Sequence, residues 1–171
     1  MAAPQPEWWQ RGPVEGVPAM LQPVAHMILQ LRDEVPTKVE GLSLEGWNAR
    51  PAGVASVTYH MRHIPGVLDR LFTYARGEGL TEAQFAAAKH ETEPMVGDER
   101  QALLDNLKAQ TERCLAELKT VDASKLAEVR YVGRKKVPST MIGCLTHGAE
   151  HGMRHMGQLL VTARVAAGEK A

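Results

Sequence analysis

Apolar side chains recur every three or four residues along most of the chain, the spacing that places them on one face of an α-helix. The pattern predicts four long amphipathic helices, over residues 17–35, 56–76, 99–121 and 139–167, and a short helix over 82–88. Residues 128–137 break the pattern, because valines and a tyrosine surround a glycine there. That segment indicates either a small hairpin or an extended crossover before the last helix.

Glycines and prolines mark the ends of these helices. Gly46, Pro51 and Gly53 predict a loop over residues 41–53. Pro65 instead falls inside the second long helix, where it removes one backbone hydrogen bond, so we expect a bend near His63. Four long helices with almost no strand predict an all-α four-helix bundle.

Length and composition favour one globular domain. The chain has 171 residues, and its 44% hydrophobic content is enough for a core. We therefore expect a single domain over residues 1–171. Residues 1–14, with prolines around Trp8 and Trp9, are expected to form an extended N-terminal arm that packs its indoles on another surface.

Charge and cysteine content narrow the classes of function. The chain has 20 Lys and Arg against 20 Asp and Glu, which disfavours binding to nucleic acid or to an anionic membrane. No apolar stretch approaches the roughly 20 residues that cross a bilayer, and residues 1–6 do not resemble a signal peptide. Cys114 and Cys144 lack a Cys-x-x-Cys spacing, which suits a reducing compartment. We expect a soluble cytoplasmic protein.

Three histidines at four-residue spacing, His147, His151 and His155, lie in the last predicted helix. Residues four apart share a helix face, so two neighbouring imidazoles can reach one cation. The outer two are separated by about 12 Å along the axis, whereas metal–imidazole bonds are about 2 Å. One ion can therefore take only an adjacent pair. On a helical wheel His151 and His155 border the apolar stripe, while His147 lies on the solvent side, so the predicted pair is His151 with His155.

A third ligand would have to come from another helix. The second long helix carries His60 and His63, and either one would complete a set of three nitrogens with an open coordination position, as in catalytic sites. Periodicity places His60 deeper in the apolar stripe and slightly favours it. In the alternative interpretation, the histidines only pack and hydrogen-bond in a bundle that binds no metal.

Two motifs of the chain resemble those of the DinB/YfiT-like family of small four-helix bundles. One is His63-Ile64 followed by Asp69-Arg70, and the other is the His-x-x-x-His-x-Gly-Gln motif that begins at His151. The resemblance covers residues 17 to 165. Members bind a divalent ion such as zinc or nickel through one histidine of the second helix and two of the last.

Carried over to this sequence, the resemblance implies the metal ligands His63, His151 and His155. It therefore favours His63 over His60. The chain departs from the family pattern at Pro65, and at Met156, where many members have arginine.

The resemblance also implies a function. Some branches use low-molecular-weight thiols, so we expect a metal-dependent hydrolase or thiol transferase that acts on a small molecule and forms a homodimer. The alternative is a stress-linked or scaffold bundle that binds metal without turnover, because no general base stands out beside the histidines. No catalytic or cofactor-binding residue follows from the sequence. Candidates to hydrogen-bond the metal ligands are Tyr59, Asp69, Glu150 and Gln158.

Overall fold

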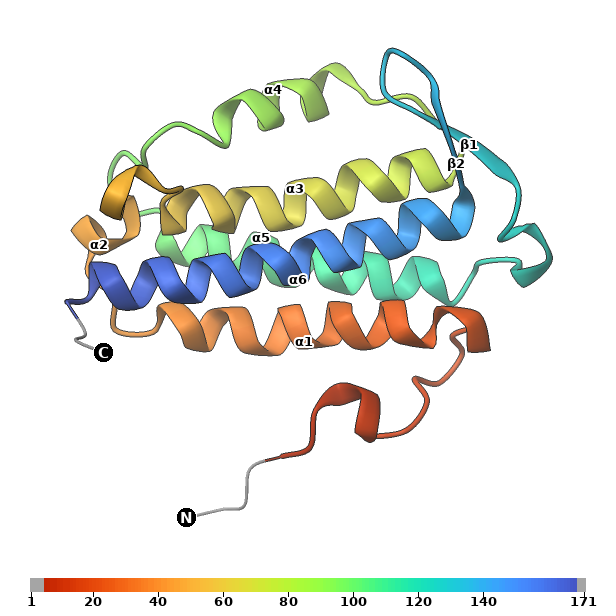
Figure 1. Cartoon of the computed structure of the whole chain (residues 1–171), viewed down its shortest axis with the longest axis horizontal. Coiled ribbons are helices and arrows are strands. Elements are labelled where there is room, and N and C mark those ends of the chain that lie inside the picture. The colour runs from red at the N-terminus through yellow and green to blue at the C-terminus, as the bar shows by residue number, and fades with distance from the viewer. Residues whose placement is uncertain (1–4, 169–171) are drawn as a thin grey trace.

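The computed structural model of the chain describes residues 5–168 and contains four long helices that lie side by side (Figure 1). They are α1 (Gln22–Val39), α3 (Val57–Ala75), α5 (Arg100–Leu118) and α6 (Met141–Ala166). The shorter helices are α2 (Leu44–Asn48) and α4 (Glu82–His90), and 3-10 turns occupy Trp8–Gln10, Ala19–Leu21, Pro51–Gly53 and Ala123–Lys125. The prediction of an all-α four-helix bundle is confirmed.

The core lies between the apolar faces of the four long helices. α3 packs against α5 and α6, and α1 packs against the same two helices. Burial of these faces stabilises the fold by roughly 25 cal/mol for each Å² of apolar surface removed from water. The largest fully buried side chains are Trp47, Phe72, Leu21, Ile28, Leu31, Met61, Ile64, Leu68, Leu107, Leu118, Leu145 and Leu159.

Several helix ends differ from the predicted ranges. α1 begins after the turn at Ala19–Leu21 and continues through Pro36, because this proline lies in the last turn and removes only one backbone hydrogen bond. α5 ends at Leu118, earlier than predicted. α3 is one continuous helix with Pro65 inside it.

The predicted loop over residues 41–53 contains a helix that the sequence pattern missed. α2 is capped by Ser43, whose Oγ accepts a hydrogen bond from the backbone N–H of Gly46 at 3.1 Å. Five residues are too few to show a helical period. Trp47 of this helix is buried, and its carbonyl accepts a hydrogen bond from Thr58 at 3.0 Å, which joins α2 to the start of α3.

A two-stranded hairpin precedes the last helix, which decides between the hairpin and the extended crossover. β1 (Val129–Val132) pairs antiparallel with β2 (Val137–Thr140), with Val129 opposite Thr140. The turn between them uses Gly133 at a φ of 70°, a backbone conformation that suits glycine. Thr140 then caps α6 by accepting a hydrogen bond from the N–H of Gly143 at 3.0 Å.

The described part of the predicted N-terminal arm contacts the bundle through one of its two indoles. The turn that begins at Trp8 lies against α1, where the Trp8 Nε1 donates to Asp33 Oδ2 at 3.0 Å. Trp9 is 64% exposed, so the expectation that both indoles pack was wrong for this residue. Residues 1–4 of the arm lie outside the described residues. From residue 5 to 168, no helix combines the length and the apolar character that a membrane span requires.

Candidate metal centre

The predicted histidines lie where α3 and α6 pack against each other. Ser56 starts α3 by accepting a hydrogen bond from the N–H of Tyr59 at 3.2 Å. Glycines let α6 approach its neighbours closely, because a Cβ on Gly152 would lie 2.7 Å from Leu31 Cδ1 and one on Gly148 would lie 3.4 Å from Leu71 Cβ. The glycines therefore make room for α1 and α3, and the histidines on the adjacent face of α6 lie opposite those of α3.

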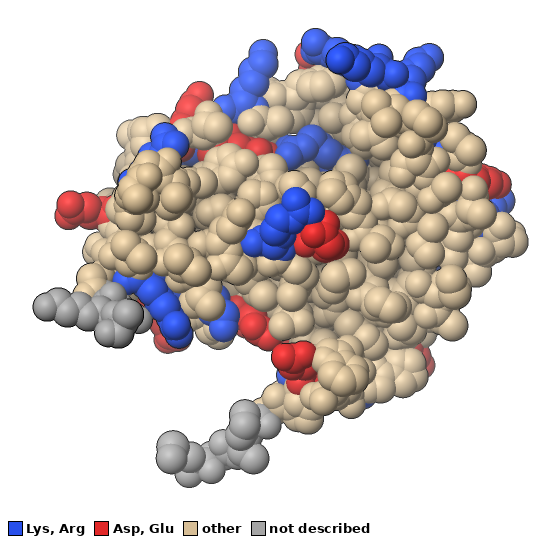
Figure 2. All heavy atoms as spheres, in the orientation of Figure 1, with Lys and Arg blue, Asp and Glu red and all other residues tan. Residues whose placement is uncertain are grey.

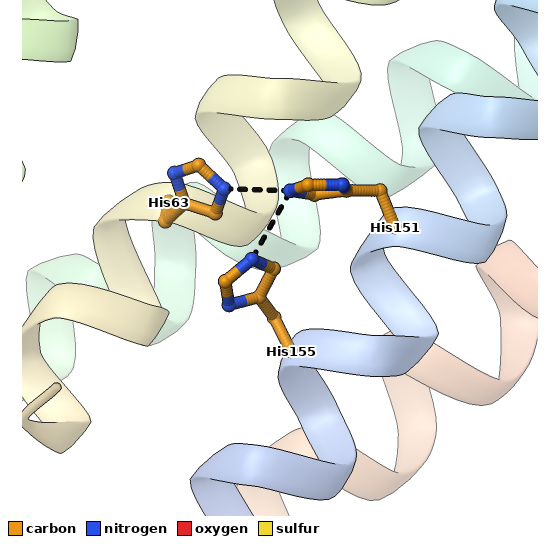
Figure 3. Close-up of side chains that lie close together, drawn as sticks. All are labelled: His63, His151 and His155. Atoms are coloured by element: carbon orange, nitrogen blue, oxygen red, sulfur yellow. Dashed lines mark hydrogen bonds between the residues drawn. The ribbon is translucent and has the colours of Figure 1, made fainter. Parts of the chain in front are cut away.

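Three imidazoles converge between these two helices (Figure 3). The Nε2 atom of His63 lies 3.0 Å from the Nε2 atom of His151, which lies 3.1 Å from that of His155. One ring nitrogen from each histidine falls within 4.8 Å of the other two. A tetrahedral ion with nitrogen ligands at about 2.0–2.1 Å separates them by about 3.4 Å. Small side-chain shifts would bring the three nitrogens to that spacing.

A carboxylate contacts the Nδ1 atom of His63, the outer ring nitrogen that is not in contact with the other two histidines. Glu91, which follows α4, lies with its Oε2 atom 2.7 Å from His63 Nδ1, and its Oε1 atom accepts a hydrogen bond from Arg70 at 2.6 Å. Glu91 is only 6% exposed. Burial raises the pKa of this carboxyl, but the hydrogen bonds from His63 and Arg70 and the positive charge of Arg70 outweigh it, so the pKa is lowered and Glu91 is ionised.

The outer nitrogen of His155 faces another histidine. His60 is buried at 2% exposure, and its Nδ1 atom lies 3.0 Å from His155 Nδ1. Burial, followed by repulsion from His63, lowers the pKa of His60 to about 4. Burial and the neighbouring histidines lower the pKa of His155 to about 3, and burial also lowers that of His151. Neutral imidazoles are the form that binds metal ions.

Proton counting shows that the cluster suits a cation. A neutral imidazole has one N–H and one nitrogen lone pair. If His63 donates its Nδ1 proton to Glu91, its Nε2 atom keeps a lone pair. The Nε2 atom of His151 contacts both His63 Nε2 and His155 Nε2, but a single N–H there can be donated to only one of them. One pair of nitrogens is then left without a shared proton. A divalent ion would accept all three lone pairs.

The other predicted residues lie at varying distances from the cluster. His147 is exposed and lies 3.4 Å from Glu150, outside the three-histidine group. The Tyr59 ring stacks on His63 with centroids 5.0 Å apart. Asp69 accepts a hydrogen bond from Gln84, and Glu150 accepts from Arg154, so neither meets the predicted role of bonding to a ligand.

Glu91 is the site residue that sequence reasoning missed. It lies between a short helix and a loop, and no periodic pattern relates it to α3. The candidates named from the sequence to hydrogen-bond the ligands were Tyr59, Asp69, Glu150 and Gln158, whereas the partner of His63 Nδ1 comes from the segment after α4. Only a three-dimensional arrangement brings the two together.

A cavity of about 560 Å³ has His60 in its wall, while its lining includes none of His63, His151 and His155. α6 contributes Arg154, which immediately precedes His155 and is paired with Glu150. The remaining walls are mostly apolar or small, and they comprise Val54, Ala55, Gly157, Gln158, Val161 and Thr162. The volume and the apolar lining are typical of small-molecule sites.

Comparison with known proteins is decisive for the family. A family model described as the DinB superfamily matches residues 27–159, more than half of the chain. The chain belongs to the DinB superfamily. The resemblance noted in the sequence is thereby confirmed, and the three histidines lie inside the matched DinB region.

A solved structure shows the same fold as this DinB chain. It is described as the crystal structure of the conserved protein of locus from Enterococcus faecalis, and it aligns with a TM-score of 0.71 at 21% sequence identity. The alignment covers 87% of this chain and 98% of the other. At this identity the likeness shows the fold alone. No curated protein matches the chain.

Proposed function

We propose that this DinB protein holds a divalent metal ion, zinc or nickel, through the Nε2 atoms of His63, His151 and His155. The observation that carries the proposal is the convergence of these nitrogens from two helices, with Nε2–Nε2 separations of 3.0 and 3.1 Å. Three nitrogen ligands leave a fourth position open, which distinguishes catalytic sites from closed structural ones.

We propose that the chain catalyses one of two reactions on a small molecule. The first is hydrolysis, and the second is a transfer that depends on a low-molecular-weight thiol. When bound, the ion supplies Lewis acidity, which lowers the pKa of a water or thiol and polarises an electrophile. The chain supplies the surroundings: the Tyr59 ring stacks on the His63 ring, and the Glu91 carboxylate lies 2.7 Å from His63 Nδ1. We infer no catalytic residue beyond the ligands.

The cavity beside His60 is the proposed site for the small-molecule substrate. Its one full positive charge, on Arg154, is neutralised by both carboxylate oxygens of Glu150. The lining therefore suits an uncharged apolar group better than an anion. His60 connects the cavity to the cluster, because its Nδ1 atom contacts His155.

The second candidate function is a metal-binding dimer without turnover. In the view of Figure 2, the face formed by α3 and α6 is mostly uncharged, apart from opposite charges near its centre and above it. Val54, Val161 and Val165 are about half exposed or more, at 49%, 63% and 53%. A second copy of the chain could cover these side chains. A dimer measured by analytical ultracentrifugation, with no turnover of thiol or ester substrates, would favour this candidate.

We further propose that the chain acts as one domain over residues 1–171 in the cytoplasm. Cys114 and Cys144 are both buried and unpaired, which fits a reducing compartment.

Elemental analysis tests the metal site. Protein prepared without a histidine tag and incubated with zinc or nickel should retain about one equivalent per chain after dialysis. His151→Ala should retain less than about a tenth of an equivalent. The matched control is His147→Ala, one turn earlier on the same helix and exposed, which should bind as the unmodified chain does. Equal metal content in both variants would refute the site.

A further inference from the structure

We propose that Glu91 is a positioning residue of the metal site, which holds His63 in the ring orientation and tautomer that binds the ion. This inference rests on the proposed metal site and concerns a residue outside the ligand set. The Glu91 carboxylate lies between His63 Nδ1, at 2.7 Å, and Arg70 Nη1, at 2.6 Å, and Glu91 is almost fully buried.

The first support is the direction of the hydrogen bond. Glu91 Oε1 accepts a hydrogen bond from the Arg70 guanidinium at 2.6 Å, and a carboxylate in such an ion pair only accepts hydrogen bonds, so His63 carries its proton on Nδ1. Its Nε2 atom, which lies 3.0 Å from His151 Nε2, then keeps its lone pair. A carboxylate on the outer nitrogen also makes the imidazole a stronger ligand.

The second support is the glycine that makes room for the carboxylate. A Cβ on Gly66 would lie 2.6 Å from Glu91 Oε1 and 3.0 Å from Arg70 Nη1. Glycine inside a helix costs about 1 kcal/mol relative to alanine. Gly66 lies in the middle of α3, at the point where the Glu91 side chain packs against this helix and contacts His63.

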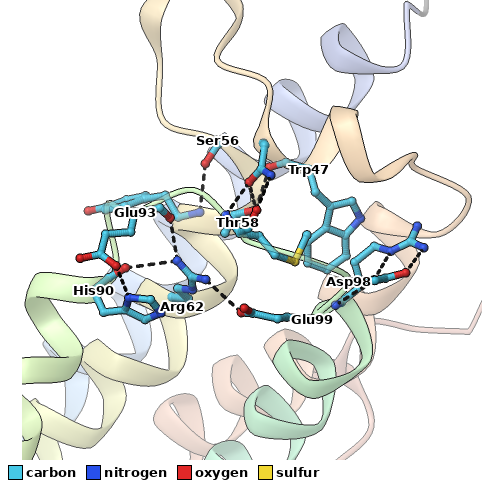
Figure 4. Close-up of polar contacts among 12 residues, drawn as sticks. Trp47, Ser56, Thr58, Arg62, His90, Glu93, Asp98 and Glu99 are labelled. Atoms are coloured by element: carbon cyan, nitrogen blue, oxygen red, sulfur yellow. Dashed lines mark hydrogen bonds and ion pairs between the residues drawn. The ribbon is translucent and has the colours of Figure 1, made fainter.

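The third support is a separate anchor for the segment that carries Glu91. The guanidinium of Arg62, on α3, donates to the carbonyls of His90 at 3.2 Å and Glu93 at 2.6 Å, on either side of Glu91 (Figure 4). It also pairs with Glu99 at 3.1 Å. Arg62 is buried. The backbone around Glu91 is therefore held on α3 independently of the His63 contact.

The three candidate ligands differ in this respect. The outer nitrogen of His155 meets the neutral ring of His60. The outer nitrogen of His151 is buried and has no hydrogen-bond partner among residues 5–168. Only His63 has a charged partner, so the anchoring of the site depends most on Glu91.

Zinc affinity of the full chain, measured by competition with a chromophoric chelator, tests the proposal. Glu91→Gln should weaken zinc binding by about 10–100-fold, the range for outer partners of metal ligands. Its control is Glu99→Gln, which removes a carboxylate paired with α3 through Arg62 and does not touch His63. The control should stay within about twofold of the unmodified protein.

Gly66→Ala separates positioning from a merely structural ion pair. The added methyl meets only the ends of two flexible side chains, so the fold should survive and the helix should gain stability. Displacement of the carboxylate should nevertheless weaken zinc binding by about tenfold. Gly157→Ala, whose Cβ would meet open space on α6, is the matched control and should not change zinc affinity. If circular dichroism shows that Glu91→Gln does not fold, the zinc affinity of Gly66→Ala alone tests the positioning role of Glu91.

The outcomes separate the two proposals. If the unmodified chain binds zinc and His151→Ala does not, but Glu91→Gln and Gly66→Ala match their controls, the positioning role is overturned and the metal site stands. If the unmodified chain binds no zinc, both proposals are overturned.

Discussion

His60 and His63 lie one turn apart on α3, and each contacts a histidine of α6, yet their surroundings differ. His60 is enclosed by the bundle and meets only the neutral His155 ring through Nδ1. His63 is half-buried, and a charged carboxylate binds its Nδ1 atom, so its Nε2 atom is directed to the cluster. The depth of a histidine in an apolar stripe is therefore a poor guide to its role. The partner on its outer nitrogen is the better one.

The largest expected effect separates these two histidines. His63→Ala should weaken zinc binding by more than the roughly 100-fold upper range for outer residues, because it removes a proposed ligand. His60→Ala should weaken it by about tenfold, since His60 acts through His155. Calorimetric titration with zinc measures both. A larger loss of zinc affinity in His60→Ala than in His63→Ala would indicate that His60 is the ligand, and would contradict the roles assigned to the two histidines.

The second prediction tests packing on the core side of α6, next to the histidines. Gly152→Ala places a methyl 2.7 Å from Leu31 Cδ1, and overpacking of this kind typically costs about 1–3 kcal/mol. Chemical denaturation of the metal-free protein should show this loss. Gly157→Ala, in open space, should not lose stability. Similar stability in the two variants would mean that α6 and α1 are not packed as closely as described.

The third prediction uses the low pKa of His60. The folded chain lowers this pKa from 6.5 to about 4, so the unfolded chain binds the proton first as pH falls. The contribution of His60 to the stability of the metal-free protein is therefore fully present above about pH 6.5 and is lost as the pH falls toward 4, by an amount on the order of 3 kcal/mol. His60→Phe should flatten this part of the curve of unfolding free energy against pH. An unchanged slope would show that His60 is not buried in neutral form.

The fourth and smallest prediction concerns the cavity on the His60 side. Gly157→Phe should fill it and weaken binding of the neutral fluorescent probe N-phenyl-1-naphthylamine by about tenfold, at unchanged zinc content. The same side chain introduced at an exposed position of α5, Glu112→Phe, is the control. Probe binding that is unaffected by Gly157→Phe would remove this cavity as the substrate site.

The fold could be predicted because long amphipathic helices have a period that the sequence displays, as α3 and α6 do. Helix α2 could not be predicted, because its five residues are too few to show a repeating apolar pattern. It is stabilised by the Ser43 cap and by the buried Trp47 side chain. The pair on α6 followed from spacing, and the resemblance to the family supplied His63. Glu91 and Arg62 were not predictable, because their roles depend on where the segment after α4 crosses α3.

X-ray absorption spectroscopy at the zinc edge of the zinc-loaded protein tests the central claim most directly. The account predicts three imidazole nitrogens at about 2.0–2.1 Å and one further light ligand, and both His63→Ala and His151→Ala should lose this zinc signal together with the bound metal. A zinc environment without imidazole scattering, or one that neither substitution changes, would contradict it.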